Sequence, residues 1–139
     1  MKITRCFSVH DTEHGIVAVH FDDLSTVTLW IRQPDGRTVV RQDEFRPYFW
    51  TVGAPAPDDI PTGEVRQLDG GLPFDHLVTF DTWPALTKAR AALKVANQPV
   101  FQLGDPIQQY LLATGKTLFK SLEWPAIRRM QIAVDSQSI

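Results

Sequence analysis

The sequence contains a single cysteine, Cys6, among its 139 residues. One cysteine excludes an internal disulfide, and this favours a reducing compartment such as the cytoplasm. No apolar run approaches the roughly 20 residues that a membrane-spanning helix needs. The start of the chain, Met1-Lys2-Ile3, leads into a polar strand and not into a secretion signal. We therefore expect a cytoplasmic protein with no membrane partner, and we interpret Cys6 as a small core residue.

Motifs of common catalytic sites are also lacking. The sequence has no Ser/His/Asp order, no Gly-rich phosphate loop and no Cys/His spacing typical of zinc sites. One N-terminal segment is rich in imidazoles and carboxylates, which together can bind a transition metal. Because Gly15 and the predicted flanking strands argue against a helix, His10 and His14 would not share one side. We interpret this segment as a solvated turn and its flank. Its residues are His10, Asp11, Glu13, His14, His20, Asp22 and Asp23.

Positive charge is scarce in the first part of the chain. Residues 1–82 hold seven Lys/Arg against thirteen Asp/Glu, whereas residues 83–139 hold seven against three. The overall net charge of −2 argues against a dedicated nucleic-acid-binding protein, which is usually basic. The positive second part could still contact phosphate while the acidic part faces solvent or a neighbouring domain. A length of 139 residues with 43% hydrophobic residues predicts one globular domain.

The first half of the chain has the pattern of short β-strands separated by turns. Residues 26–32 (TVTLWIR) are rich in β-branched and aromatic side chains, and residues 33–36 (QPDG) supply a turn. Residues 38–41 follow as the partner strand, so this stretch predicts a β-hairpin. Three prolines in residues 54–62 predict a surface loop. Further strands are predicted over residues 3–9, 15–21, 45–52, 64–68 and 77–80.

Two helices are predicted in the second half, each with a recognisable start. Asp81 or Thr82 can cap a first helix, which carries Leu86, Ala89 and Leu93 at helical spacing. Asp105 caps a second helix that begins at Pro106 and ends at Gly115. The apolar face of this second helix is predicted to hold Ile107, Tyr110, Leu111 and Thr114. Short strands are predicted over residues 100–103 and 127–134, with a connector over residues 116–124.

Aromatic and basic side chains are the candidates for binding nucleic acid. Aromatic residues on strands can stack bases, although alternation predicts that one face of residues 45–52 packs in the core. The stacking candidates are Trp30, Tyr48, Phe49 and Trp50. The densest basic group could be a solvated face or a set of phosphate contacts, and the few acids nearby favour phosphate. This group consists of Lys116, Lys120, Arg128 and Arg129.

Asp135 follows an apolar strand, where a divalent-metal ligand is often found. Two-metal phosphoryl chemistry needs several converging carboxylates, and the sequence supplies only one here. We therefore predict no catalytic residue, no metal site and no cofactor in this chain.

Several segments resemble, in order, the N-terminal domain of family B DNA polymerases, the archaeal-like type that also occurs in bacteria. The hairpin VTLWIRQPDGRTVV (residues 27–40) precedes FRPYFW (residues 45–50), which is similar to the family's F-x-P-Y-F-Y strand. Residues 78–93 resemble its strand–helix unit. The more specific matches are DPIQQYLL (residues 105–112), similar to the helix before the exonuclease domain, and IRRMQI (residues 127–132), similar to the first exonuclease strand.

The resemblance implies an α+β fold with two parts. Residues 1–126 would form the N-terminal domain, an open OB-like antiparallel β structure with two flanking helices. Residues 127–139 would be the truncated start of an RNase H-like 3′–5′ exonuclease domain. In the family this strand ends in Asp-Ile-Glu, whose carboxylates open the Mg²⁺ site of the full-length enzyme. Ala133 takes the place of the aspartate here and Asp135 that of the glutamate, which implies a non-catalytic region.

Three functions follow from these observations. In the family this domain lines the path of the single-stranded template, so the first hypothesis is binding of single-stranded or template DNA in replication or repair. Its phosphate contacts would be the four basic residues above, and the rest of a polymerase would be a further partner. The second hypothesis is a stand-alone β module that docks a protein through Ile132, Val134 and an open sheet edge. The third is a residual metal-dependent nuclease that uses Asp135.

Overall fold

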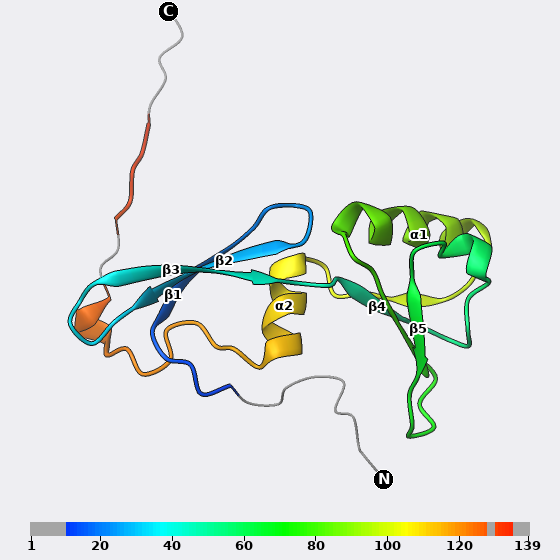
Figure 1. Ribbon diagram of the computed structural model, residues 1–139, viewed down its shortest axis with the longest axis horizontal. Helices are drawn as coiled ribbons and strands as arrows, with labels where there is room; N and C mark the ends of the chain where they lie inside the picture. Colours follow the sequence, from blue (N-terminus) through cyan, green and yellow to red (C-terminus); the bar gives the residue numbers. More distant parts are fainter. Residues whose placement is uncertain (1–10, 128–129, 135–139) are drawn as a thin grey trace, which may run out of the picture.

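The computed structural model describes residues 11–127 and 130–134. Its architecture is α+β, with two antiparallel sheets and two α-helices (Figure 1). This confirms the predicted α+β class with antiparallel strands and two helices. No strand pairing among the described residues joins the two sheets into a closed barrel. The predicted strand over residues 3–9 lies outside the described residues, as do Cys6, Arg128, Arg129 and Asp135.

The first sheet, sheet A, has the strand order β1-β2-β3. Its strands are β1 (Ile16–Phe21), β2 (Thr26–Arg32) and β3 (Thr38–Glu44). The predicted hairpin is confirmed, because β2 and β3 pair along their whole length from Thr26↔Glu44 to Arg32↔Thr38. Strand β2 alternates: Val27, Leu29 and Ile31 are buried on one face, and the residues between them are only partly buried.

The second sheet, sheet B, has the strand order β5-β6-β4-β7. Its strands are β4 (Tyr48–Thr51), β5 (Glu64–Gln67), β6 (His76–Thr79) and β7 (Val100–Phe101). Helix α1 (Trp83–Val95) packs on this sheet with the three apolar residues that its spacing predicted, Leu86, Ala89 and Leu93. Its cap is Thr82, whose side chain accepts a hydrogen bond from Ala85 N.

Helix α2 (Pro106–Thr114) packs on the inner face of sheet A, where Ile107 and Leu111 contact the same core as Leu29. The predicted cap at Asp105 and the left-handed end at Gly115, with φ 71°, are confirmed. The predicted apolar face was incomplete, because Gln109 is fully buried. Its Oε1 accepts a hydrogen bond from Tyr48 N at 3.0 Å, and its Nε2 donates to Leu103 O at 3.3 Å. Gln109 therefore connects α2 to sheet B.

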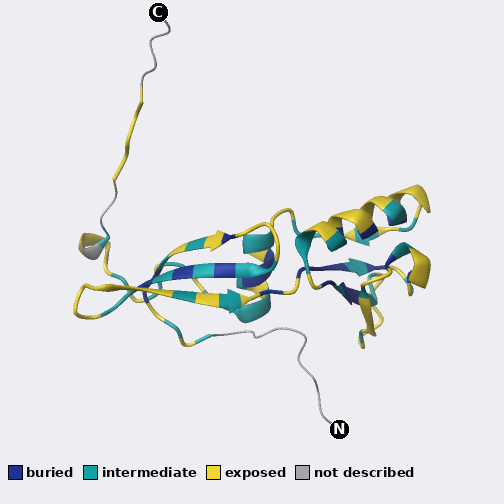
Figure 2. Ribbon diagram, turned by 45° about the horizontal axis from the view of Figure 1, so that its top comes forward, coloured by how far each residue is buried: buried dark blue, intermediate teal, exposed yellow. Residues whose placement is uncertain are grey.

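Strand β4 lies between two hydrophobic cores. Tyr48 packs in the core of sheet A and α2, whereas Phe49 packs in the core of sheet B and α1. Both residues are therefore buried, although alternation alone had predicted one buried face. Figure 2 shows buried residues concentrated in the central strand of sheet A and within sheet B. Trp83 contacts both cores and so joins the two halves of the molecule.

Two predicted segments differ from the structure. The proline-rich loop over residues 54–62 contains a 3-10 turn, Pro57–Asp59, and buries Ile60, because Ile60 packs in the core with Phe80. The predicted last strand is wrong over residues 130–134, which form no strand. Met130, Ile132 and Val134 are 82%, 72% and 86% exposed. A strand needs a hydrogen-bonded neighbour, and the described residues supply none to this segment.

Candidate nucleic-acid interface

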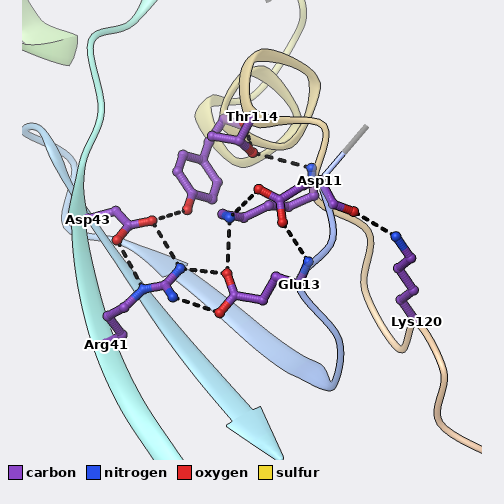
Figure 3. A network of polar contacts seen from close by, with 8 residues as sticks. Asp11, Glu13, Arg41, Asp43, Thr114 and Lys120 are labelled. Carbon is purple, nitrogen blue, oxygen red and sulfur yellow. Dashed lines mark hydrogen bonds and ion pairs between the residues drawn. The ribbon is translucent and has the colours of Figure 1, made fainter. Parts of the chain in front are cut away.

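The two described members of the predicted basic group lie beside the N-terminal segment. Lys116 Nζ lies 2.7 Å from Asp11 Oδ2 and 3.0 Å from Glu13 Oε2, and its side chain is only 9% exposed. Lys120 Nζ donates a hydrogen bond to the backbone oxygen of Asp11 at 2.6 Å. Figure 3 shows Asp11 between Glu13 and Lys120. The structure thus brings Lys116 and Lys120 together around acidic residues of the predicted N-terminal turn.

The same polar network continues to strand β3 and helix α2. Arg41 forms a two-pronged contact with Glu13, with N–O distances of 2.6 and 2.7 Å. Arg41 Nε also contacts Asp43 Oδ1 at 3.2 Å, and Tyr110 Oη donates a hydrogen bond to Asp43. The network (Figure 3) therefore holds the N-terminal segment, sheet A and α2 in one arrangement.

These contacts keep the network charged. The Lys116 ammonium and the Glu13 N–H lower the pKa of Asp11. The Arg41 guanidinium lowers the pKa of Glu13. Burial opposes the charge of Lys116, but its hydrogen bonds to both carboxylates outweigh burial and raise its pKa. Phosphate contact by Lys116 stays a prediction, and a phosphate would have to compete with two carboxylates for this ammonium.

Replacing Lys116 by methionine should lower the free energy of unfolding by about 2 kcal/mol at neutral pH, because two partly buried carboxylates lose a cation. Asp11 and Glu13 have lower pKa values folded than unfolded. Their contribution to stability is therefore complete above about pH 5, and it is lost as the pH falls from the unfolded pKa values near 4 through the lower folded values. Urea denaturation at neutral and at acid pH should show that acid lowers the free energy of unfolding less for K116M than for the natural chain.

The matched control is Lys88→Met on the exposed face of α1. This substitution should change stability by less than about 0.5 kcal/mol. Equal effects of K88M and K116M would show that the network does not contribute to stability.

The outer face of sheet A, opposite α2, is an open surface centred on Trp30. The register places Ala18 and Val40 on either side of Trp30, and His20 and Gln42 on either side of Thr28. Ala18, His20, Val40 and Gln42 are exposed, and no described helix packs on this face. Trp30 is only partly buried and belongs to neither hydrophobic core. Of the four predicted stacking candidates, Trp30 alone lies on this face, since Tyr48 and Phe49 are core residues and Trp50 packs against the core.

Arg32 lies at one end of this outer face and Glu44 at the other, so its charge is asymmetric. Sequence reasoning singled out Trp30 as a stacking candidate and named His20 only in a solvated flank, and it missed Arg32 and Gln42. The period of two along residues 26–32 could have placed Arg32 on the face of Trp30.

A second concave surface lies where the two sheets meet. This cleft of about 370 Å³ has an aromatic lining that includes Phe45, Tyr48 and Tyr110. Arg46 contacts Glu64 at 2.9 Å. The lining holds two charges of each sign, from Glu44, Arg46, Glu64 and Arg66. The charges of this lining therefore cancel, which leaves little net charge for an ionic ligand.

Comparisons with known proteins gave no match to this chain among family models, curated proteins or solved structures. Among residues 11–127 and 130–134, no group of three or more His, Cys, Asp or Glu side chains could hold a metal ion. No helix in the described part of the chain combines the length and the apolar character needed to cross a bilayer.

Proposed function

We propose that this protein binds single-stranded or template DNA and has no catalytic activity of its own. The observation that carries the proposal is the open outer face of sheet A, with Trp30 at its centre and Arg32 at one end. A partly exposed aromatic ring on a sheet offers a surface on which a base can stack, and neighbouring cations can contact the nucleic-acid backbone. The resemblance to the N-terminal domain of family B DNA polymerases supports the same function.

The finer fold assignment belongs to this proposal. Residues 1–126 would be an OB-like template-binding domain, and residues 127–139 the start of an exonuclease domain within a larger polymerase. Sheet A is compatible with this reading, because it is an antiparallel sheet with one face covered by α2 and the other open. Lys116, Lys120, Arg128 and Arg129 stay predicted phosphate contacts, and Arg32 is added to them.

Replacing Trp30 by alanine should weaken binding of a labelled oligothymidylate by about tenfold or more at low salt, because stacking of one base on an aromatic residue contributes about 1–3 kcal/mol. Fluorescence anisotropy measures this affinity. Trp30→Phe should retain most of it, because phenylalanine keeps an aromatic face. Circular dichroism should show an unchanged fold, since Trp30 belongs to neither core.

The matched control is Trp124→Ala, which removes another tryptophan that is 85% exposed and lies outside both sheets. This variant should bind like the natural chain. Equal binding by W30A and the natural chain would contradict the proposal, and so would an equal loss in W124A.

A second candidate function is docking of a protein partner. It is favoured by the apolar side chains of Met130, Ile132 and Val134, which are largely exposed in a segment without a neighbouring strand. Such a segment can be added as a strand to the sheet edge of another protein. Light scattering distinguishes the candidates, because docking between copies gives a mass that rises with concentration and DNA binding does not require it.

A further inference from the structure

A cleft at the Arg32 end of the outer face has the composition of an anion site. It has a volume of about 600 Å³ and lies between the start of β1, the β2–β3 turn and the connector that follows α2. Its lining residues are His14, Gly15, Arg32, Gln33, Pro34, Ser121 and Leu122. The lining contains one cation, two further polar side chains that can donate hydrogen bonds to an anion, an imidazole and no carboxylate.

Backbone hydrogen bonds hold the three sides of the cleft together. Arg32 N donates to Gly15 O at 2.7 Å, which joins β2 to the residue before β1. Gly15 N in turn donates to Lys120 O at 3.0 Å, so the connector lies against the same residue. This brings Ser121 to His14, and Ser121 Oγ lies 2.6 Å from His14 Nδ1. The cleft is therefore formed by segments that are far apart in the sequence.

Arg32 has an unused hydrogen-bond donor. Its Nε is buried and makes no hydrogen bond within the part of the chain that the structure describes. No carboxylate among these residues forms an ion pair with Arg32. Arg37, Arg41 and Arg46 differ from Arg32, since all three contact acidic side chains. Arg66 on β5 has no ion pair within the described ranges either, but its side chain is exposed and does not line this cleft. A buried donor without a partner is unfavourable, and a rotation of the guanidinium that turned Nε–H toward an anionic oxygen in the cleft would satisfy it.

We propose that this cleft binds a phosphate group, with Arg32 as the main contact and His14 and Ser121 as hydrogen-bonding neighbours. The planar guanidinium presents several donors in a fixed fork that matches phosphate oxygens. Arg32 and Trp30 are two residues apart on one face of β2, so a base on Trp30 places its backbone phosphate beside the cleft. The inference rests on the proposed function and names the phosphate position of the same site.

The direct test is a titration of the full chain with inorganic phosphate, followed by NMR of the arginine Nε–H groups. The Arg32 Nε–H signal should shift with saturation, and the Arg37 signal should not, because Arg37 is 85% exposed and paired with Asp35. Sulfate should compete with phosphate, and chloride at equal ionic strength should not. A shift of all arginine signals together would mean general screening and would overturn the inference. So would an Arg32 signal that does not move.

The second test uses R32Q and the matched control R37Q in the oligothymidylate assay. R32Q should weaken binding by about tenfold, because a charge-assisted hydrogen bond is lost. It should also reduce the salt slope by about 0.7, the contribution of one phosphate contact on a single strand. R37Q should change neither. A shallower slope in R37Q equal to that in R32Q would contradict the assignment of the contact to Arg32.

The two tests separate this inference from the proposed function. If phosphate shifts the Arg32 Nε–H signal but W30A binds DNA normally, the proposal of a phosphate cleft is supported and the proposal of a stacking surface is wrong. If W30A loses DNA binding but phosphate leaves Arg32 unchanged and R32Q binds normally, DNA binding stands and the cleft is not its phosphate position.

Discussion

Replacing Gly15 by alanine should lower the free energy of unfolding by about 4 kcal/mol, the sum of a left-handed backbone, an overpacked contact and weakened hydrogen bonds. Gly15 has φ +80°, and a Cβ there would lie 2.4 Å from the backbone oxygen of Arg32. That oxygen is a backbone atom, so it cannot move away as the end of a flexible side chain could. The backbone must therefore move, and this movement weakens the backbone hydrogen bonds that join Gly15 to Arg32 and to Lys120. Urea denaturation with a spectroscopic probe measures the loss.

The matched control for this substitution is Gly36→Ala in the β2–β3 turn. Gly36 has a nearly equal φ of +85°, but a Cβ there would meet nothing within 4 Å. G36A should therefore cost only the conformational part, about 1 kcal/mol. If both variants lose the same stability, the close approach of Gly15 to Arg32 has no energetic effect. G15A should also weaken phosphate binding, because Gly15 lines the proposed cleft.

Replacing Gln109 by alanine should lower the free energy of unfolding by about 3 kcal/mol, because the buried Tyr48 N–H loses its acceptor and a cavity opens. Tyr48 Oη also donates to the backbone oxygen of Gln109 at 2.9 Å, so strand β4 and helix α2 meet at this point. Gln109→Leu separates the two costs. Leucine fills most of the volume but accepts no hydrogen bond, so it should recover only the part due to the cavity.

Gln108→Ala is the control for Gln109, since it removes the same side chain from the next position of α2, where it is exposed. This variant should stay within about 0.5 kcal/mol of the natural chain. Denaturation curves for Q108A and Q109A that coincide would mean that the buried amide contributes nothing. A loss in Q109L as large as that in Q109A would assign the whole effect to the missing acceptor.

Local signals in the sequence predicted most of the secondary structure. The turn at residues 33–36 and the β-branched residues around it predicted the β2–β3 hairpin. Asp105 with Pro106, and Gly115 with its left-handed backbone, fixed the two ends of α2. These features succeed because caps, turns and alternation depend on a few neighbouring residues. The spacing of apolar residues likewise predicted the buried face of α1.

Burial depended on which elements pack against one another, and the sequence pattern did not show this. Tyr48 and Phe49 are neighbours on opposite faces of β4, and both are buried because a core lies on each side. Gln109 is polar and is buried because it meets the backbone of β4. Residues 130–134 have a strand pattern but form no strand, because pairing requires a neighbour.

For the candidate interface too, some features could be predicted from the sequence and others required the folded structure. Charge and composition identified Lys116 and Lys120 as a basic group, and alternation identified Trp30 as a possible stacking residue. Only the tertiary structure placed Asp11 and Glu13 against Lys116, and Ser121 beside His14. The residue numbers of these partners differ by about a hundred, and those of His14 and Ser121 differ by 107. The sequence by itself determined which elements form, because local hydrogen bonds and side-chain periodicity suffice for that. The folded structure decided which charges are paired and that Arg32 lines a cleft without a carboxylate partner among the described residues, because those contacts depend on how distant segments pack.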